Sequence, residues 1–133
     1  MRTPLAALCF CLLLVPINSP ASAPARENPL FDRYYTSIGF EEEKVRLNNY
    51  AIQLQNGPGS RGLIIVYSES DAAAKSAQAR ARRAMRYLVK KHGVSAGKLS
   101  WRYEGACGRE QVLLYVLYPN EADPLPDANC RKA

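Results

Sequence analysis

The sequence predicts one small α/β domain, an α+β sandwich in which a mixed sheet carries two helices on one face. Residues 63–67 (LIIVY) are a continuous apolar run, which is typical of a central strand covered on both sides. A helical pattern lies on each side of this run, and two more strand-like segments follow at the end. The predicted order is strand, helix, strand, helix, strand, strand, and both helices bury their apolar stripes on the sheet.

The first strand and the first helix are predicted before the central run. Residues 30–38 (LFDRYYTSI) are rich in aromatic and β-prone residues and predict a strand or extended arm that Gly39 ends. Residues 40–55 predict a helix with three glutamates at 41–43, where negative charge meets the positive end of the helix dipole. Its apolar stripe is expected to comprise Val45, Leu47, Tyr50, Ala51 and Leu54.

The second helix is predicted over residues 72–91, after a loop at 68–71 that is expected to cap it. Gly93 ends this helix behind a positively charged last turn. Residues 98–104 alternate between apolar and polar and predict a half-buried strand. Residues 111–118 (QVLLYVLY) predict a last, largely buried strand.

The N-terminus has the layout of a signal peptide. Arg2 precedes an apolar run at residues 5–17, which is shorter than the roughly twenty residues that a membrane-spanning helix needs. Small residues follow, so we expect a signal peptide over residues 1–25, cleaved near Ala25, the alternative being an uncleaved anchor. The sequence thus predicts export to the periplasm or cell envelope, and a mature domain (residues 26–119) without a transmembrane segment.

Two cysteines remain after cleavage, Cys107 and Cys130. An exported domain with two thiols can close one internal disulfide, whose loop of about two dozen residues contributes on the order of 3 kcal/mol. This bond ties the Pro-rich tail, residues 120–133, to the loop before the last strand. Two free thiols or an intermolecular bridge are the alternatives.

Catalytic signals are absent from the sequence. The only histidine, His92, sits at the end of the second helix, where an imidazole more often complements the helix dipole than acts as a base. No nucleophile motif, Gly-rich phosphate loop or metal-ligand spacing is found. We therefore predict a protein that is not an enzyme and uses no cofactor or metal.

Basic residues gather on the second helix in a chain of net charge +6. A solvated basic surface is expected from Arg82, Arg83, Arg86 and Lys90. Arg80 lies nearer the apolar stripe, so its guanidinium should emerge where helix meets sheet, close to Ser70 and Asp71. Such a group could bind a zwitterion, the arginine taking its carboxylate and Asp71 its amine, or simply form an Arg80–Asp71 ion pair.

The sequence resembles the OmpA-like domain of bacterial cell envelopes over residues 31–119. LIIVYSESD is similar to the family's second strand and following loop, and QARARRAMRYLVKKHGVSAGKLSWRYEG to its Arg-Ala helix, turn and next strand. The resemblance implies a periplasmic module, often of outer-membrane proteins, that binds the diaminopimelate of peptidoglycan stem peptides. The carboxylate would be bound by Arg80, while the family's aspartate position falls on Ser70, one residue before Asp71.

Three functions remain open at this point. The leading prediction is non-covalent binding of peptidoglycan stem peptides through Arg80. The alternative is a protein-interaction module of the same fold that has lost this binding and docks an acidic partner on its basic helix. Anionic lipid headgroups are a third partner class, although the helix lacks the large exposed apolar face of interfacial helices. Export excludes nucleic acid as the partner of these charges.

Overall fold

The computed structural model of the protein describes residues 29–130, and its elements follow the predicted order. The strands and helices, with two short 3-10 turns, are β1 (Leu30–Tyr35), α1 (Phe40–Asn56), β2 (Arg61–Ser68), η1 (Asp71–Ala73), α2 (Ala74–His92), η2 (Ala96–Lys98), β3 (Leu99–Ala106) and β4 (Gln111–Leu117). The fold class is confirmed. The predicted signal peptide lies outside the described residues.

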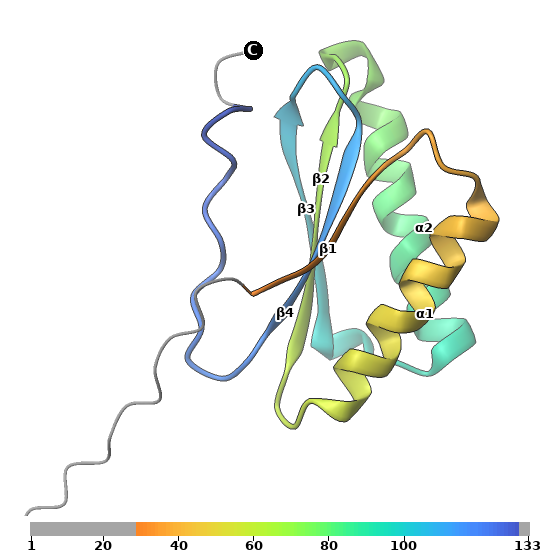
Figure 1. Ribbon diagram of the computed structural model, residues 1–133, viewed down its shortest axis with the longest axis vertical. Helices are drawn as coiled ribbons and strands as arrows, with labels where there is room; N and C mark the ends of the chain where they lie inside the picture. The colour runs from red at the N-terminus through yellow and green to blue at the C-terminus, as the bar shows by residue number, and fades with distance from the viewer. Residues whose placement is uncertain (1–28, 131–133) are drawn as a thin grey trace, which may run out of the picture.

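The four strands form one mixed sheet in the order β1-β4-β2-β3. β2 runs parallel to β3, to which α2 connects it, and antiparallel to β4, which in turn pairs with β1. The two central strands, β2 and β4, are buried almost along their whole length, as their apolar sequences predict. Figure 1 shows both helices on one side of this sheet.

The helix-covered face holds the larger core. Side chains of α1 and α2 pack against alternate residues of the strands in one cluster that includes Leu47, Tyr50, Leu88, Ile64 and Leu114. The three buried alanines of α2, Ala77, Ala81 and Ala84, bring that helix close to the sheet. Because this stripe faces inward, the charged side of α2 is left toward solvent.

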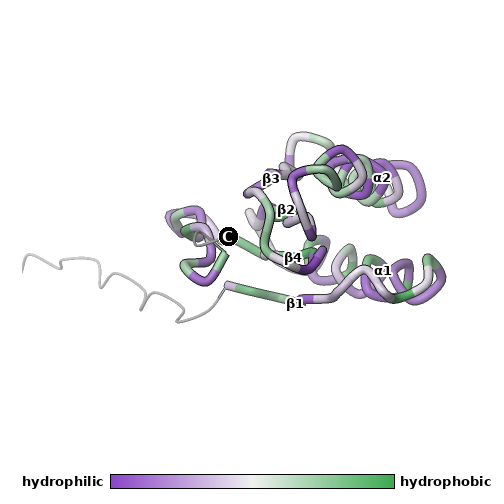
Figure 2. Tube along the Cα trace, turned by 90° about the horizontal axis from the view of Figure 1, so that it is seen from above, coloured by the Kyte–Doolittle hydropathy of each residue, from purple (hydrophilic) through white to green (hydrophobic). Residues whose placement is uncertain are grey.

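The opposite face is covered by the C-terminal segment. Residues 120–130, which we call the strap, run beside the sheet without helix or strand (Figures 1 and 2). The predicted disulfide is present and joins Cys107, after β3, to Cys130 at the end of the strap. Tyr67 accepts a hydrogen bond from the backbone of Asp127 at 2.8 Å, and Arg61 and Arg102 both pair with Asp123.

Two details of the helices differ from the sequence prediction. No side chain of the loop at 68–71 caps the second helix; the chain instead makes the 3-10 turn η1, and α2 begins at Ala74. On α1, the predicted core residue Val45 is 57% exposed, whereas Glu43 is fully buried. The assignment of Val45 to the apolar stripe was therefore wrong, because the stripe continues through Glu43. Within residues 29–130, neither helix is long and apolar enough to cross a membrane.

Candidate functional site

Arg80 lies at the junction of α2, α1 and the β3–β4 loop, and its charge is balanced by two glutamates. Its Nη1 donates to Glu43 Oε2 at 3.2 Å, and its Nε donates to Glu110 Oε1 at 3.2 Å. The side chain keeps 19% of its surface exposed. No residue between 29 and 130 accepts a hydrogen bond from Nη2, which leaves one edge of the guanidinium toward solvent.

Glu43 is the centre of this cluster. It comes from the first turn of α1, is fully buried, and has both carboxylate oxygens bonded. Oε1 accepts from the hydroxyl of Tyr34 at 3.0 Å, while Oε2 accepts from Arg80 and, at 2.7 Å, from Arg83. A buried carboxylate with two arginines and a phenol is well compensated, and removal of one member would leave the others desolvated and unpaired. Burial, with the nearby carboxylate of Glu43, raises the pKa of Tyr34.

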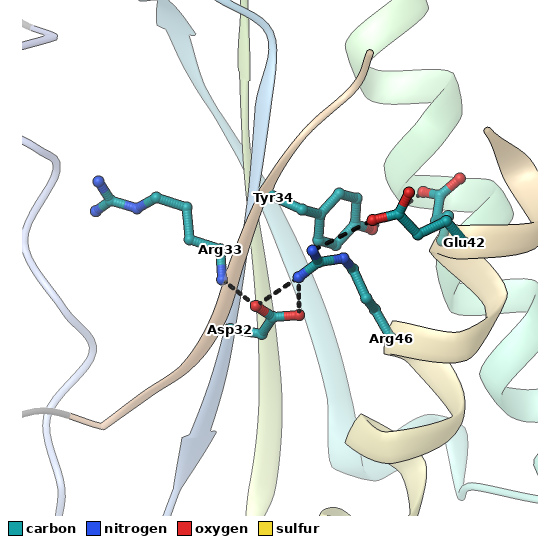
Figure 3. A network of polar contacts seen from close by, with 6 residues as sticks. Asp32, Arg33, Tyr34, Glu42 and Arg46 are labelled. Carbon is teal, nitrogen blue, oxygen red and sulfur yellow. Dashed lines mark hydrogen bonds and ion pairs between the residues drawn. The ribbon is translucent and has the colours of Figure 1, made fainter. Parts of the chain in front are cut away.

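A second ion-pair group fixes the edge strand β1 against α1 beside this cluster. Asp32 on β1 accepts two hydrogen bonds at 2.9 Å from Nη1 of Arg46, and Nη2 of the same arginine donates to Glu42 Oε1 at 3.4 Å (Figure 3). The Arg46 guanidinium lies over the ring of Tyr34, with 5.6 Å from Cζ to the ring centroid. The hydrogen bond to Asp32 raises the pKa of Arg46. Tyr34, and through it Glu43, is therefore held from both sides.

Neither of the two residues predicted beside Arg80 pairs with it. Ser70 and Asp71 are both exposed at the start of η1, and neither makes a side-chain bond to any of the residues the structure places. The Arg80–Asp71 ion pair, one of the two alternatives, is thus not formed, since the guanidinium is bound by residues of α1 and of the β3–β4 loop instead. The three glutamates at 41–43 were explained above by the helix dipole alone, but they have different roles. Glu43 points into the protein and is the counter-charge of Arg80 and Arg83.

A polar pocket adjoins the Arg80 cluster. It has a volume of about 330 Å³ and lies between the β1–α1 loop, the end of β2 and the β3–β4 loop. Glu110, which pairs with Arg80, lines it together with Glu69 and Arg109, and Arg109 lies over the Tyr35 ring at 3.7 Å. The pocket therefore offers both signs of charge within reach of one small ligand.

The basic face of α2 is a second candidate site. Arg82, Arg86 and Lys90 are exposed as predicted, and Arg82 lies over the Trp101 ring at 5.6 Å. Arg83 is half-exposed but already bound to Glu43. An apolar hollow of about 280 Å³ opens on this face; we call it the Phe40–Tyr87 groove, and it is lined by Phe40, Arg83, Arg86, Tyr87, Lys90 and Lys91.

His92 lies at the end of α2, where its Nε2 is 2.6 Å from Asn48 Oδ1 and its ring meets Tyr87 edge-on. In the part of the chain that the structure describes, no three histidine, cysteine or acidic side chains converge as metal ligands would. We did not predict from the sequence that Glu43, Glu110, Phe40 and Tyr87 would belong to these sites. The signal for Glu43 was present, because it precedes Leu47, Tyr50 and Leu54 at helical spacing on the apolar stripe.

Comparison with known proteins finds no family model that matches this chain and no curated protein with significant similarity to it. The chemistry of the two surfaces described above is therefore what indicates a function.

Proposed function

We propose that this protein is a non-enzymatic docking module that binds an acidic protein partner through the exposed face of α2. The observation that carries the proposal is the absence of counter-charge on that face. Helix α2 contains no acidic residue, and Arg86, Lys90 and Lys91 form no ion pair with any residue from 29 to 130. Clustered, unopposed cations create a field that attracts and orients an acidic surface.

The internal ion pairs of Arg80 favour the exposed face of α2 as the binding surface over a ligand that Arg80 alone would hold. Glu43 and Glu110 already supply two carboxylates, so an incoming carboxylate would compete with groups of the protein itself. The cations near the C-terminal end of α2 have no such internal competitor. A partner that binds there gains electrostatic energy without breaking a native pair.

A titration with a fluorescein-labelled decaglutamate peptide tests the proposal on the purified protein. Binding should weaken as salt rises. The variant Arg86→Glu/Lys90→Glu should lose about tenfold in affinity, because it places like charge against the peptide. Arg33→Glu/Lys75→Glu is the matched control, with the same charge change at two exposed positions away from Arg86 and Lys90, and should lose about threefold or less through the general field. Equal losses in both variants, or no binding by the wild type, would overturn the proposal.

We further propose that the protein acts outside the cytoplasm. The signal-peptide pattern of residues 1–25 motivates this, and the Cys107–Cys130 disulfide supports it, since such bonds persist in oxidising compartments. Fractionation of cells that express the full chain should recover the processed protein, shortened by about 25 residues, outside the cytoplasm. An unprocessed cytoplasmic product would contradict the proposal.

Binding of peptidoglycan stem peptides is a second candidate, favoured by one observation. Glu110, which pairs with Arg80, lines a pocket that also presents Glu69 and Arg109, a combination that suits a zwitterion. Co-sedimentation with purified peptidoglycan tests it: Arg80→Ala and Arg109→Ala should each abolish sedimentation while Arg82→Ala does not. Wild-type protein that stays in the supernatant at low salt would remove this candidate.

A further inference from the structure

The Phe40–Tyr87 groove joins the first turn of α1 to the last turns of α2. Two aromatic rings form its apolar lining, and four cationic side chains surround them. Long basic side chains can lay their methylene stems on an apolar surface while the charged ends remain in water. The groove therefore combines an apolar interior with a positive rim.

The lining of the groove is fixed by contacts within the protein. Tyr87 donates a hydrogen bond to Asn48 Oδ1 at 2.8 Å, and its ring packs edge-on against Phe40 with centroids 6.5 Å apart. His92 packs edge-on against the same tyrosine at 5.3 Å, so two neighbouring rings and one hydrogen bond fix the position of Tyr87. A surface that is ordered before binding loses little entropy when a ligand arrives.

Phe40 is exposed although it lies among charges. Lys44 Nζ is 4.7 Å from its ring centroid and Arg83 Cζ is 4.6 Å from it, yet 39% of the residue remains accessible. Arg83 is held in place by Glu43 at 2.7 Å. The exposed part of the Phe40 ring thus lies between two positioned cations, and an aromatic ring of a ligand could pack on it.

We infer that this groove binds one aromatic side chain of an acidic peptide segment, with carboxylates on both sides of that residue pairing with Arg86, Lys90 and Lys91. This inference rests on the proposed function and names the kind of segment that the partner must supply. The positive rim of the groove calls for acidic residues on both sides of the bound residue. The apolar hollow of about 280 Å³ calls for an aromatic side chain as the bound residue itself. Aromatic anchors in apolar pockets with charged rims are the usual energetic centres of protein interfaces.

An anionic membrane fits these observations less well. The apolar stripe of α2 is turned into the core, where Ala77, Ala81, Ala84 and Leu88 are buried. Phe40 is then the main exposed apolar group beside the basic face, whereas an interfacial helix inserts a whole apolar face. The single hollow of the Phe40–Tyr87 groove therefore suits one side chain of a peptide better than a lipid surface.

Two synthetic peptides of equal charge test the inference with the full chain: acetyl-EEEFEEE-amide and acetyl-EEEAEEE-amide. The wild type should bind the phenylalanine peptide about tenfold more tightly, because only that peptide buries a ring. Phe40→Ala should remove this preference while it keeps the affinity for the alanine peptide. Ile52→Ala, which truncates an exposed apolar residue of α1 outside the groove, should retain the preference.

The outcomes separate the inference from the proposed function. Equal wild-type affinity for both peptides would contradict the aromatic site in the groove but not the proposed binding of an acidic partner to α2. Binding of neither peptide would overturn both. Vesicles of phosphatidylglycerol bound in a Phe40-dependent manner, without a preference between the peptides, would replace the peptide segment by a lipid surface. Far-UV circular dichroism of both variants confirms that they fold.

Discussion

The two faces of the sheet are closed in different ways. On the helix-covered face, sixteen buried residues from the strands and both helices form one cluster, and the buried Glu43 lies at its edge. On the other face the buried cluster has seven members, one of them Cys130 of the strap. The strap itself has no regular structure, and its Leu125 is 82% exposed. The disulfide and a few polar contacts therefore secure the strap over a smaller apolar cluster.

This difference shows which parts of the molecule depend on one another. Packing and buried charge make the helix face cooperative, so a lesion there should unfold the domain as a whole. A segment held at one end by a covalent bond can open by itself. Since the Phe40–Tyr87 groove and the Arg80 cluster both lie on the helix side, release of the strap should leave the candidate binding surfaces in place.

The largest expected effect comes from the helix side. Glu43→Ala removes a fully buried carboxylate, takes the acceptor from Tyr34 and Arg83, and leaves Arg80 with Glu110 alone, which should reduce the free energy of unfolding by about 4 kcal/mol. Urea denaturation followed by circular dichroism measures it. The control Glu41→Gln alters a glutamate whose side chain is 87% exposed and should change stability by about 0.5 kcal/mol or less. A loss below about 1 kcal/mol for Glu43→Ala would mean that the cluster does not stabilise the fold.

The next effect comes from the strap side. Cys107→Ser/Cys130→Ser opens a loop with a sequence separation of 23 and should cost about 3 kcal/mol by the same measurement. Unlike Glu43→Ala, it should retain the affinity of the wild type for decaglutamate, because the groove is formed by α1 and α2 on one face of the sheet and the strap covers the other face (Figure 1). Hydrogen exchange should increase in residues 120–130 and remain slow in β2 and β4. Loss of protection in the central strands would show that the two faces are not independent.

The fold followed closely from the sequence because its signals are local. The apolar run of β2, the alternation in β3 and the Gly93 stop after α2 each depend on neighbouring residues, and the structure has all three. The start of α2 was misplaced because the chain makes a 3-10 turn there, which no capping side chain marks. The disulfide could be predicted because only two cysteines, Cys107 and Cys130, follow the predicted signal peptide.

The candidate site was harder to predict because it depends on contacts between distant residues. Helical angle correctly placed Arg80 near the sheet, but could not choose among the carboxylates that approach it. The nearest in sequence, Asp71, was the natural expectation; the actual partners come from 37 and 30 residues away. The groove joins Phe40 to Tyr87 across two helices, and this pairing depends on how α1 and α2 pack, which a single sequence does not specify.

Alkaline titration compares the two faces directly. Burial raises the pKa of Tyr34 and Tyr50 on the helix side and of Tyr67 and Tyr115 on the strap side. Each keeps its proton in the folded state after the unfolded chain has lost it. Stability is therefore fully present below about pH 10 and falls above it, by about 1.4 kcal/mol per pH unit for each such tyrosine. Urea unfolding at a series of pH values measures this slope, and Tyr34→Phe should reduce it by one proton.

The disulfide variant sharpens the same titration. Opening the strap should let Tyr67 and Tyr115 ionise at lower pH, while Tyr34 and Tyr50 remain protonated under the helices. Tyrosinate absorbance in the near ultraviolet reports the number of phenols released. If all four ionise together, the faces open as one unit.

The smallest effect is expected from the ion pairs of the strap. Asp123→Asn removes the pairs with Arg61 and Arg102, in which Asp123 is 46% exposed, and should cost less than about 1 kcal/mol because water and salt screen such pairs. Asp32→Asn is the matched change on the helix side, where Asp32 is 24% exposed and holds Arg46 through both oxygens. Its loss of stability, measured by urea denaturation, should be the larger of the two. Added salt should reduce the difference in free energy of unfolding between the wild type and Asp123→Asn. The same difference for Asp32→Asn should change less, because the more exposed ion pairs are screened more strongly. A larger loss of stability for Asp123→Asn than for Asp32→Asn would mean that the ion pairs of the strap stabilise the fold more than the Asp32–Arg46 pair does.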